Sequence, residues 1–199
     1  MPRERDRIFW SDGAGGIHMV AATPAEAAGR APRAAGDRVS RTSLALGAAL
    51  AALALARHGL TREGVLAAGL LPVLAVLTGI DLRCRLLPNR IVLPALVAVL
   101  AWQIGLAPQR TGEWLAAAVG AAVFLLAPSL LRPGAVGIGD VKLAALLGAA
   151  LGAEVAGALL IGLAVMAPVA LIVLWRRGRD ATLPMGPCLA FGAALVLLA

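Results

Sequence analysis

From residue 42 onward, apolar runs alternate with short breaks that contain charged residues, proline or glycine. A transmembrane helix needs roughly 20 apolar residues, within a range of about 17–25, and most of these runs approach that length. The runs cover residues 43–56, 64–80, 91–107, 114–131, 141–151, 155–175 and 185–199. The pattern predicts an all-α fold, a multi-pass bundle of six to seven transmembrane helices embedded in a lipid bilayer.

The stretch between Asp140 and Trp175 fits either one long helix or two short ones. Gly152 and Glu154 interrupt its apolar pattern and favour a break, but length alone leaves both alternatives open. The first and last runs are also short for a crossing. The number of crossings therefore has to be argued from the distribution of charge.

Composition supports a membrane protein. Of the 199 residues, 60% are hydrophobic and 15% are charged, and the mean hydropathy is +0.88. Soluble domains are about 45–50% apolar and about 25% charged, so a chain this apolar lacks the polar coat of a cytosolic globule.

Residues 1–41 differ from the rest of the chain because they are rich in arginine, alanine, glycine and proline. They contain no apolar stretch long enough for the core of a signal peptide. We expect a disordered cytoplasmic tail over residues 1–41 and a membrane-embedded domain over residues 42–199.

The formal net charge of +7 could indicate nucleic acid, but no basic stripe with interleaved aromatic residues is present, and we expect no nucleic-acid partner. If the tail is cytoplasmic and two helices lie between Asp140 and Arg176, most basic residues fall on the cytoplasmic side of the membrane. The outer loops then hold only Arg57, Arg62 and Arg110. The inner side holds the tail arginines with Arg83, Arg85, Arg90, Arg132, Lys142, Arg176, Arg177 and Arg179.

The sequence lacks the motifs of several classes of enzyme and metal site. The cysteines Cys84 and Cys188 form no CxxC motif, which excludes a zinc ribbon and a disulfide scaffold. There is no HExxH motif, no GxSxG elbow and no phosphate-binding glycine loop. We therefore predict neither a metal ion nor a cofactor.

Two aspartates at the ends of apolar runs remain. Asp81 directly follows the second run, and Asp140 follows Gly137 and Gly139 in a GxGD segment. Two crossings separate the aspartates, so both fall on the same, cytoplasmic face. Paired carboxyl groups in a partly dry site share one proton, and one of them can activate water while the other polarises a scissile carbonyl. The two glycines would allow a close approach of backbone to the acid.

Three segments together resemble the type IV prepilin peptidases, which are GxGD-type intramembrane aspartic proteases. The first is Asp81 followed by Leu87-Pro88-Asn89, and the second is residues 137–143, ending in Val-Lys-Leu. The third is the Pro-x-Gly-Pro entry to the last run at residues 184–187. Their order and spacing agree with the family from about residue 64 to the end of the sequence.

The resemblance implies that Asp81 and Asp140 form the catalytic dyad, with Gly137, Gly139, Lys142, Pro88 and Asn89 as motif and possible substrate-binding residues. It implies removal of a short basic leader, after a glycine, from a prepilin or pseudopilin at the cytoplasmic face of the bacterial inner membrane. Larger members carry paired CxxC motifs and also methylate the new amine. The sequence has no CxxC motif, which argues against methyltransferase activity. In this respect it resembles the short, peptidase-only members that serve Flp-type pili.

Two other functions fit parts of the pattern. A small proton- or cation-coupled transporter could use Asp81 and Asp140 as ion ligands. Such proteins usually show internal repeats and charged or broken helices near the midplane, whereas here both acids lie at the ends of runs and no repeat is evident. A presenilin-like protease shares the chemistry, but its Tyr-Asp motif is missing because the sequence has no tyrosine.

Overall fold

The computed structural model describes residues 7–11, 17–21, 40–84, 87–131, 136–177 and 185–199. The chain divides into two units, Met1–Asp37 and Arg38–Ala199. The positions Arg85, Arg132, Arg179 and Pro184, which carried part of the charge and motif arguments, lie outside the described residues.

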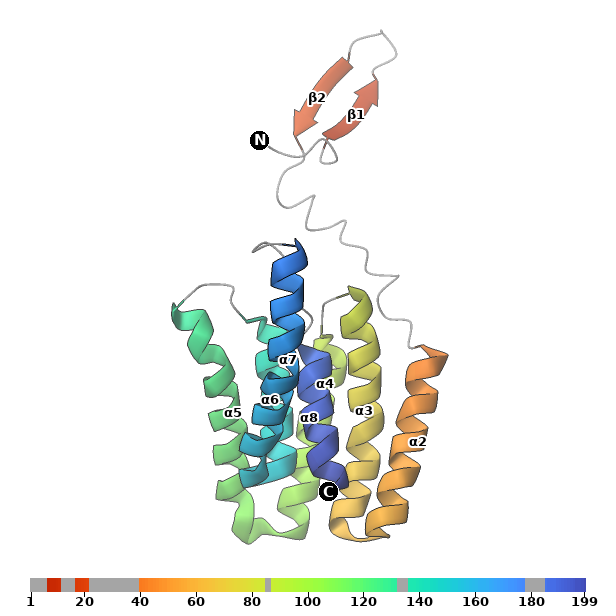
Figure 1. Cartoon of the computed structure of the whole chain (residues 1–199), viewed down its shortest axis with the longest axis vertical. Coiled ribbons are helices and arrows are strands. Elements are labelled where there is room, and N and C mark those ends of the chain that lie inside the picture. Colours follow the sequence, from red (N-terminus) through yellow and green to blue (C-terminus); the bar gives the residue numbers. More distant parts are fainter. Residues whose placement is uncertain (1–6, 12–16, 22–39, 85–86, 132–135, 178–184) are drawn as a thin grey trace. The chain divides into compact units, whose positions relative to one another are not determined.

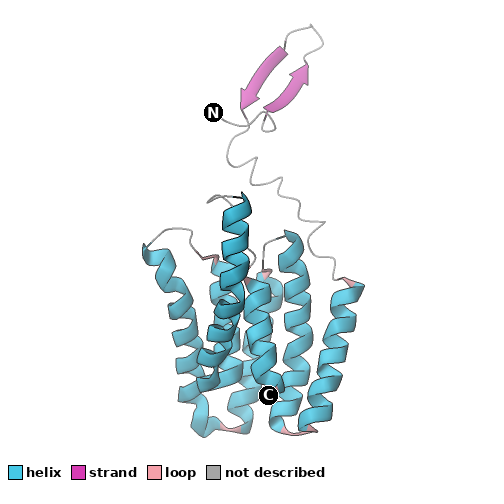
Figure 2. Ribbon diagram, viewed as in Figure 1, coloured by secondary structure: helices cyan, strands magenta, loops and turns pink. Residues whose placement is uncertain are grey.

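The first unit contains a β-hairpin. Strand β1 (Arg7–Ser11) pairs antiparallel with β2 (Ile17–Ala21), with Arg7 opposite Ala21 (Figure 2). Both strands carry β-branched or aromatic residues, which favour extended backbone, and glycines lie between them. These two strands are the described part of residues 1–39, and the disordered tail over residues 1–41 stays a prediction.

The second unit is all-α, as predicted, and its helices run alternately in opposite directions (Figure 1). Each of the seven apolar runs corresponds to one helix within the described residues. They are α2 (Arg41–His58), α3 (Arg62–Cys84), α4 (Asn89–Leu106), α5 (Thr111–Leu131), α6 (Ile138–Leu151), α7 (Val155–Arg177) and α8 (Gly186–Leu198). Two short 3₁₀ helices, η2 (Pro108–Arg110) and η3 (Gly152–Glu154), join neighbouring helices.

The stretch after Asp140 forms two helices. Helix α6 ends at Leu151 and is capped by Gly152, where φ is +59°, and α7 begins at Val155 and runs back along the bundle (Figure 1). Positive φ is accessible to glycine because it has no Cβ. The break that Gly152 and Glu154 favoured in the sequence is confirmed.

By length and apolar composition, four stretches of the described residues could cross a membrane. They are Arg62–Cys84, Asn89–Leu106, Pro108–Leu130 and Ile138–Val173. The last is 36 residues long and contains both α6 and α7, so the chain turns back within it. Together with the shorter α8 and with α2, these stretches give the multi-pass membrane protein that the sequence predicts.

Large apolar side chains cover the outside of the bundle. Leu130 is 76% exposed, Leu171 67% and Val97 67%, and many others are similarly open. Water would oppose so much contiguous apolar surface, whereas lipid tails accept it. Like the helix lengths, the exposed apolar surface therefore supports a multi-pass membrane protein.

Small residues set the closest helix contacts, as is common between membrane helices. A Cβ on Gly148 of α6 would lie 2.6 Å from the Cα of Ala118 on α5. A Cβ on Gly162 of α7 would lie 2.8 Å from the carbonyl oxygen of Cys188 on α8. The absence of a side chain at these glycines lets the backbones touch.

Helix α6 lies among α4, α5 and α8 and is the best buried helix of the bundle. Its residues Leu143, Leu146 and Leu147 are all 1% exposed or less and belong to the main apolar core. The central packing of α6 fixes the position of its first turn, which carries Asp140.

Candidate carboxylate site

Asp81 and Asp140 lie at the same end of the bundle. Asp81 is in the last turns of α3 and is 4% exposed, while Asp140 is in the first turn of α6 and is partly exposed. Helices α3 and α6 run in opposite directions with α4 and α5 between them in the chain, which returns the backbone to the same end (Figure 1).

The first turn of α8 contacts Asp81 directly. The backbone N–H of Gly186 donates a hydrogen bond to Oδ2 of Asp81, with an N···O distance of 3.2 Å. A Cβ on Gly186 would lie 2.8 Å from the same oxygen, so a side chain at this position would displace the carboxylate of Asp81. Gly186 was not among the site residues predicted individually, although the motif at residues 184–187 pointed to it.

The glycines of the GxGD segment leave room on both sides of Asp140. A Cβ on Gly137 would lie 3.2 Å from Oδ2 of Asp140. A Cβ on Gly139 would lie 3.0 Å from the Cβ of Leu87, which precedes α4. Gly139 therefore lets the segment before α4 pack against the start of α6.

A polar contact joins the same two segments. The Nζ of Lys142 donates to Oδ1 of Asn89 across 2.9 Å on the exposed side of the site. Pro88 is the N-cap residue of α4, so Asn89 is the first residue of that helix. The predicted motif residues before α4 and at the start of α6 thus lie together.

Two carboxyl groups that act on each other can hold a single proton between them, which supplies one acid and one base in the same place. Packed helices, not loops, fix the positions of both aspartates, because core residues of α3 and α6, such as Leu77 and Leu143, lie within one turn of Asp81 and Asp140. Among the described residues, no three His, Cys, Asp or Glu side chains are grouped as metal ligands would be.

The fold and the site thus define a multi-pass helical membrane protein with paired carboxyl groups at one end. The sequence profile of the type IV leader peptidase family matches residues 68–174. The chain belongs to this family. The match includes Asp81, Asp140 and the two segments that the Lys142–Asn89 contact joins.

Two curated relatives from Burkholderia pseudomallei, of strains 1026b and K96243, are each described as a prepilin leader peptidase/N-methyltransferase. Each is 36% identical over 177 residues, covering 81% of this chain and 55% of the relative. The chain therefore spans about half the length of these relatives. No solved structure matches the chain significantly.

Proposed function

We propose that this chain is an aspartic endopeptidase that removes the basic leader from prepilin-like precursors at the cytoplasmic face of the membrane. The observation that carries the proposal is the placement of Asp81 and Asp140 at the same end of the bundle, in the last turns of α3 and the first turn of α6. Membership of the type IV leader peptidase family supports this function over ion transport.

In the proposed reaction, one aspartate is ionised and takes a proton from a water molecule, which attacks the carbonyl carbon of the scissile peptide bond. The other aspartate is protonated and donates its proton to the carbonyl oxygen. Collapse of the tetrahedral intermediate breaks the C–N bond, and the proton held by the base passes to the leaving amine. Water supplies the oxygen of the new carboxyl group, and no redox step is involved.

An apolar groove of about 400 Å³ between α2, α3 and α8 is suited to the hydrophobic helix of such a precursor. Leu46, Leu71 and Phe191 are among its lining residues. At one end it reaches Thr78, which precedes Asp81 by three residues, and Pro187, which follows the Gly186 that contacts Asp81. A substrate helix in this groove would deliver its leader to the carboxyl groups.

In the proposed orientation, the end of the bundle that carries Asp81 and Asp140 faces the cytoplasm of a bacterium. The opposite end faces the outer side of the inner membrane. Arg83, Arg90 and Lys142 lie in the helix turns at the carboxylate end. Arg57 and Arg62 lie at the turn that joins α2 to α3, at the opposite end (Figure 1). Loops rich in arginine and lysine favour the cytoplasmic side.

The experiment that tests the function is cleavage in a defined system. The purified full chain, in detergent micelles, is incubated with a prepilin that has a basic leader ending in glycine. The masses of the products are measured by mass spectrometry. The proposal predicts one cut after that glycine. An intact precursor, under conditions in which a known prepilin peptidase cleaves it, would refute the proposal.

A further inference from the structure

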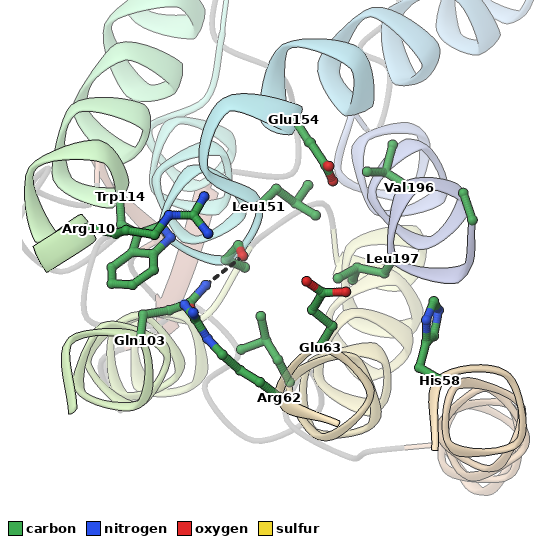
Figure 3. Close-up of a pocket in the computed structure, with 13 residues that line it drawn as sticks. His58, Arg62, Glu63, Gln103, Arg110, Trp114, Leu151, Glu154, Val196 and Leu197 are labelled. Carbon is green, nitrogen blue, oxygen red and sulfur yellow. Dashed lines mark hydrogen bonds between the residues drawn. The ribbon is translucent and has the colours of Figure 1, made fainter. Parts of the chain in front are cut away.

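A polar cavity, drawn in Figure 3, is lined by residues from the end of the bundle opposite Asp81 and Asp140. Its volume is about 410 Å³, within the range of about 300–1,000 Å³ that is usual for small-molecule sites. The polar groups that line it come from the start of α3, the end of α4, the η2–α5 turn and the α6–α7 turn. The proposed reaction does not use this cavity.

One side of the cavity carries a guanidinium that is held in place without an anion. Arg62 donates a hydrogen bond to Oε1 of Gln103, and its guanidinium lies 4.8 Å from the ring centre of Trp114. Gln103 is 3% exposed and is itself fixed, because its Nε2 donates to the carbonyl oxygen of Ala150 across 2.9 Å. Among the described side chains, no carboxylate forms an ion pair with Arg62.

A second guanidinium flanks the same indole. Arg110 lies 5.7 Å from the ring centre of Trp114, and its Nε and Nη2 donate to the carboxylate of Glu113 at 2.9 and 2.8 Å. Trp114 is 2% exposed, so the ring that both cations face is a fixed part of the core. The cavity thus has one wall with two oriented guanidinium groups.

The other side of the cavity is acidic. In Figure 3 the side chains of Glu63 and Glu154 extend into the opening from α3 and from the α6–α7 turn. Both glutamates line the same cavity as Arg62 and Arg110. Within the described part of the chain, neither glutamate has an ion-pair partner. At the rim, Nε2 of His58 is buried and has no hydrogen-bond partner there.

We propose that this cavity binds a phosphoethanolamine group, with the phosphate on Arg62 and Arg110 and the ammonium group on Glu63 and Glu154. Guanidinium groups match the geometry of phosphate oxygens, and carboxylates accept hydrogen bonds from an ammonium group. A lining with separated charges of both signs fits a zwitterion better than a simple anion. Leu66 and Leu197 supply an apolar flank for the carbon chain that follows the phosphate.

A membrane lipid is the expected source of this group. Arg62 and Arg110 lie at the beginnings of two candidate membrane-crossing stretches, Arg62–Cys84 and Pro108–Leu130, where lipid head groups lie. A free glycerophosphoethanolamine molecule has the same recognition chemistry. The two sources can be separated by testing the head group with and without its acyl chains.

The test uses the purified full chain, freed of lipid in detergent micelles, and measures binding by thermal melting and by titration. The probes are short-chain phosphatidylethanolamine, short-chain phosphatidylglycerol of the same acyl length, and free glycerophosphoethanolamine. We expect phosphatidylethanolamine to bind about 10-fold or more tightly than phosphatidylglycerol, since only it carries the ammonium group. Weak or absent binding of the free compound would identify the lipid as the source. Equal binding of the two lipids would overturn the proposal.

The double variant Glu63→Gln/Glu154→Gln removes the proposed ammonium ligands from exposed positions, so it should leave the fold intact. It should lose the preference for phosphatidylethanolamine. Arg62→Gln should weaken both lipids but also removes a partner of buried Gln103, so the glutamate variant decides the question. The matched control is Arg57→Gln, at the same end of the bundle but outside the cavity, which should bind like the wild type. Unchanged lipid preference in the glutamate variant would contradict the proposed site.

Discussion

At the scale of single residues, the hydrogen bond between Lys142 and Asn89 joins the start of α6 to the start of α4. If this contact positions the segments around Asp140, removing either partner should slow cleavage. We expect Asn89→Ala and Lys142→Met each to lower kcat/KM by up to about 10-fold, the equivalent of a charged hydrogen bond.

The double variant Asn89→Ala/Lys142→Met should be no slower than the worse single variant, since both remove one interaction. The matched control is Arg90→Met, which removes the neighbouring exposed cation and should retain full activity. Steady-state kinetics on a prepilin peptide provides the measurement. Strictly additive losses would show that the two residues act separately.

Gly139 provides a second prediction, about stability. Because a Cβ at this position would lie 3.0 Å from the Cβ of Leu87, Gly139→Val should overpack the contact and cost about 1–3 kcal/mol. Gly120→Val is the matched control, since a Cβ at Gly120 has no neighbour within 4 Å. Thermal melting in detergent should show a lower Tm for the first variant only.

The cost of Gly139→Val should shrink when Leu87→Ala is added, because the smaller side chain returns the space. A Tm that the second substitution lowers further would argue that Gly139 matters for another reason, such as its backbone conformation.

Residue type and order along the chain were enough to predict that Asp81 and Asp140 lie at the same end of the bundle, while their catalytic role stays a prediction. They did not reveal the Arg62–Gln103 hydrogen bond, because this contact joins residues on different helices and depends on how each helix is rotated in the bundle. Gln103 lies within an apolar run, and nothing in its neighbours indicates that it is buried against Ala150.

At the scale of helices, the apolar runs predicted all the helices of the second unit because glycine, proline and charge separate them clearly in the sequence. Helix packing was not predictable in the same way. Apolar residues surround each helix almost evenly, since the outer faces meet lipid and the inner faces meet protein. The central position of α6 therefore emerged only from the structure.

The groove between α2, α3 and α8 leads to a prediction for substrate binding. Ala194 lines the groove away from the carboxylates, and Ala194→Trp should fill part of it. We expect kcat/KM for a full-length prepilin to fall about 10-fold or more, while a soluble leader peptide that lacks the hydrophobic helix is cleaved as before.

The control for Ala194→Trp is Val123→Trp, on the exposed face of α5 outside the groove, where Val123 is 57% exposed. It places the same bulky side chain toward lipid and should not affect either substrate. If Ala194→Trp slowed the cleavage of both substrates equally, the groove would not be the binding site of the substrate helix.

At the scale of the whole molecule, the charge asymmetry between the two ends predicts the orientation in the membrane. Cysteine labelling can test it in a Cys84→Ala/Cys188→Ala background, which removes the native thiols. Leu86→Cys and Ala181→Cys probe the predicted cytoplasmic loops, and Leu60→Cys probes the turn between α2 and α3, where Leu60 is 89% exposed.

A membrane-impermeant maleimide should label Leu60→Cys in intact cells with the outer membrane permeabilised, and the other two only after the inner membrane is opened. The opposite pattern would invert the proposed orientation and place the carboxylate pair on the outer side.

The most direct measurement is prepilin cleavage by Asp81→Asn and Asp140→Asn, each purified as a full chain with a Tm within a few degrees of the wild type. Asp180→Asn, a carboxylate outside the described residues, is the control. The account predicts that both site variants lose about 10²–10⁴-fold or more in kcat, because one asparagine leaves the pair without its acid or its base. Near wild-type cleavage by either folded variant would contradict the two-carboxylate mechanism.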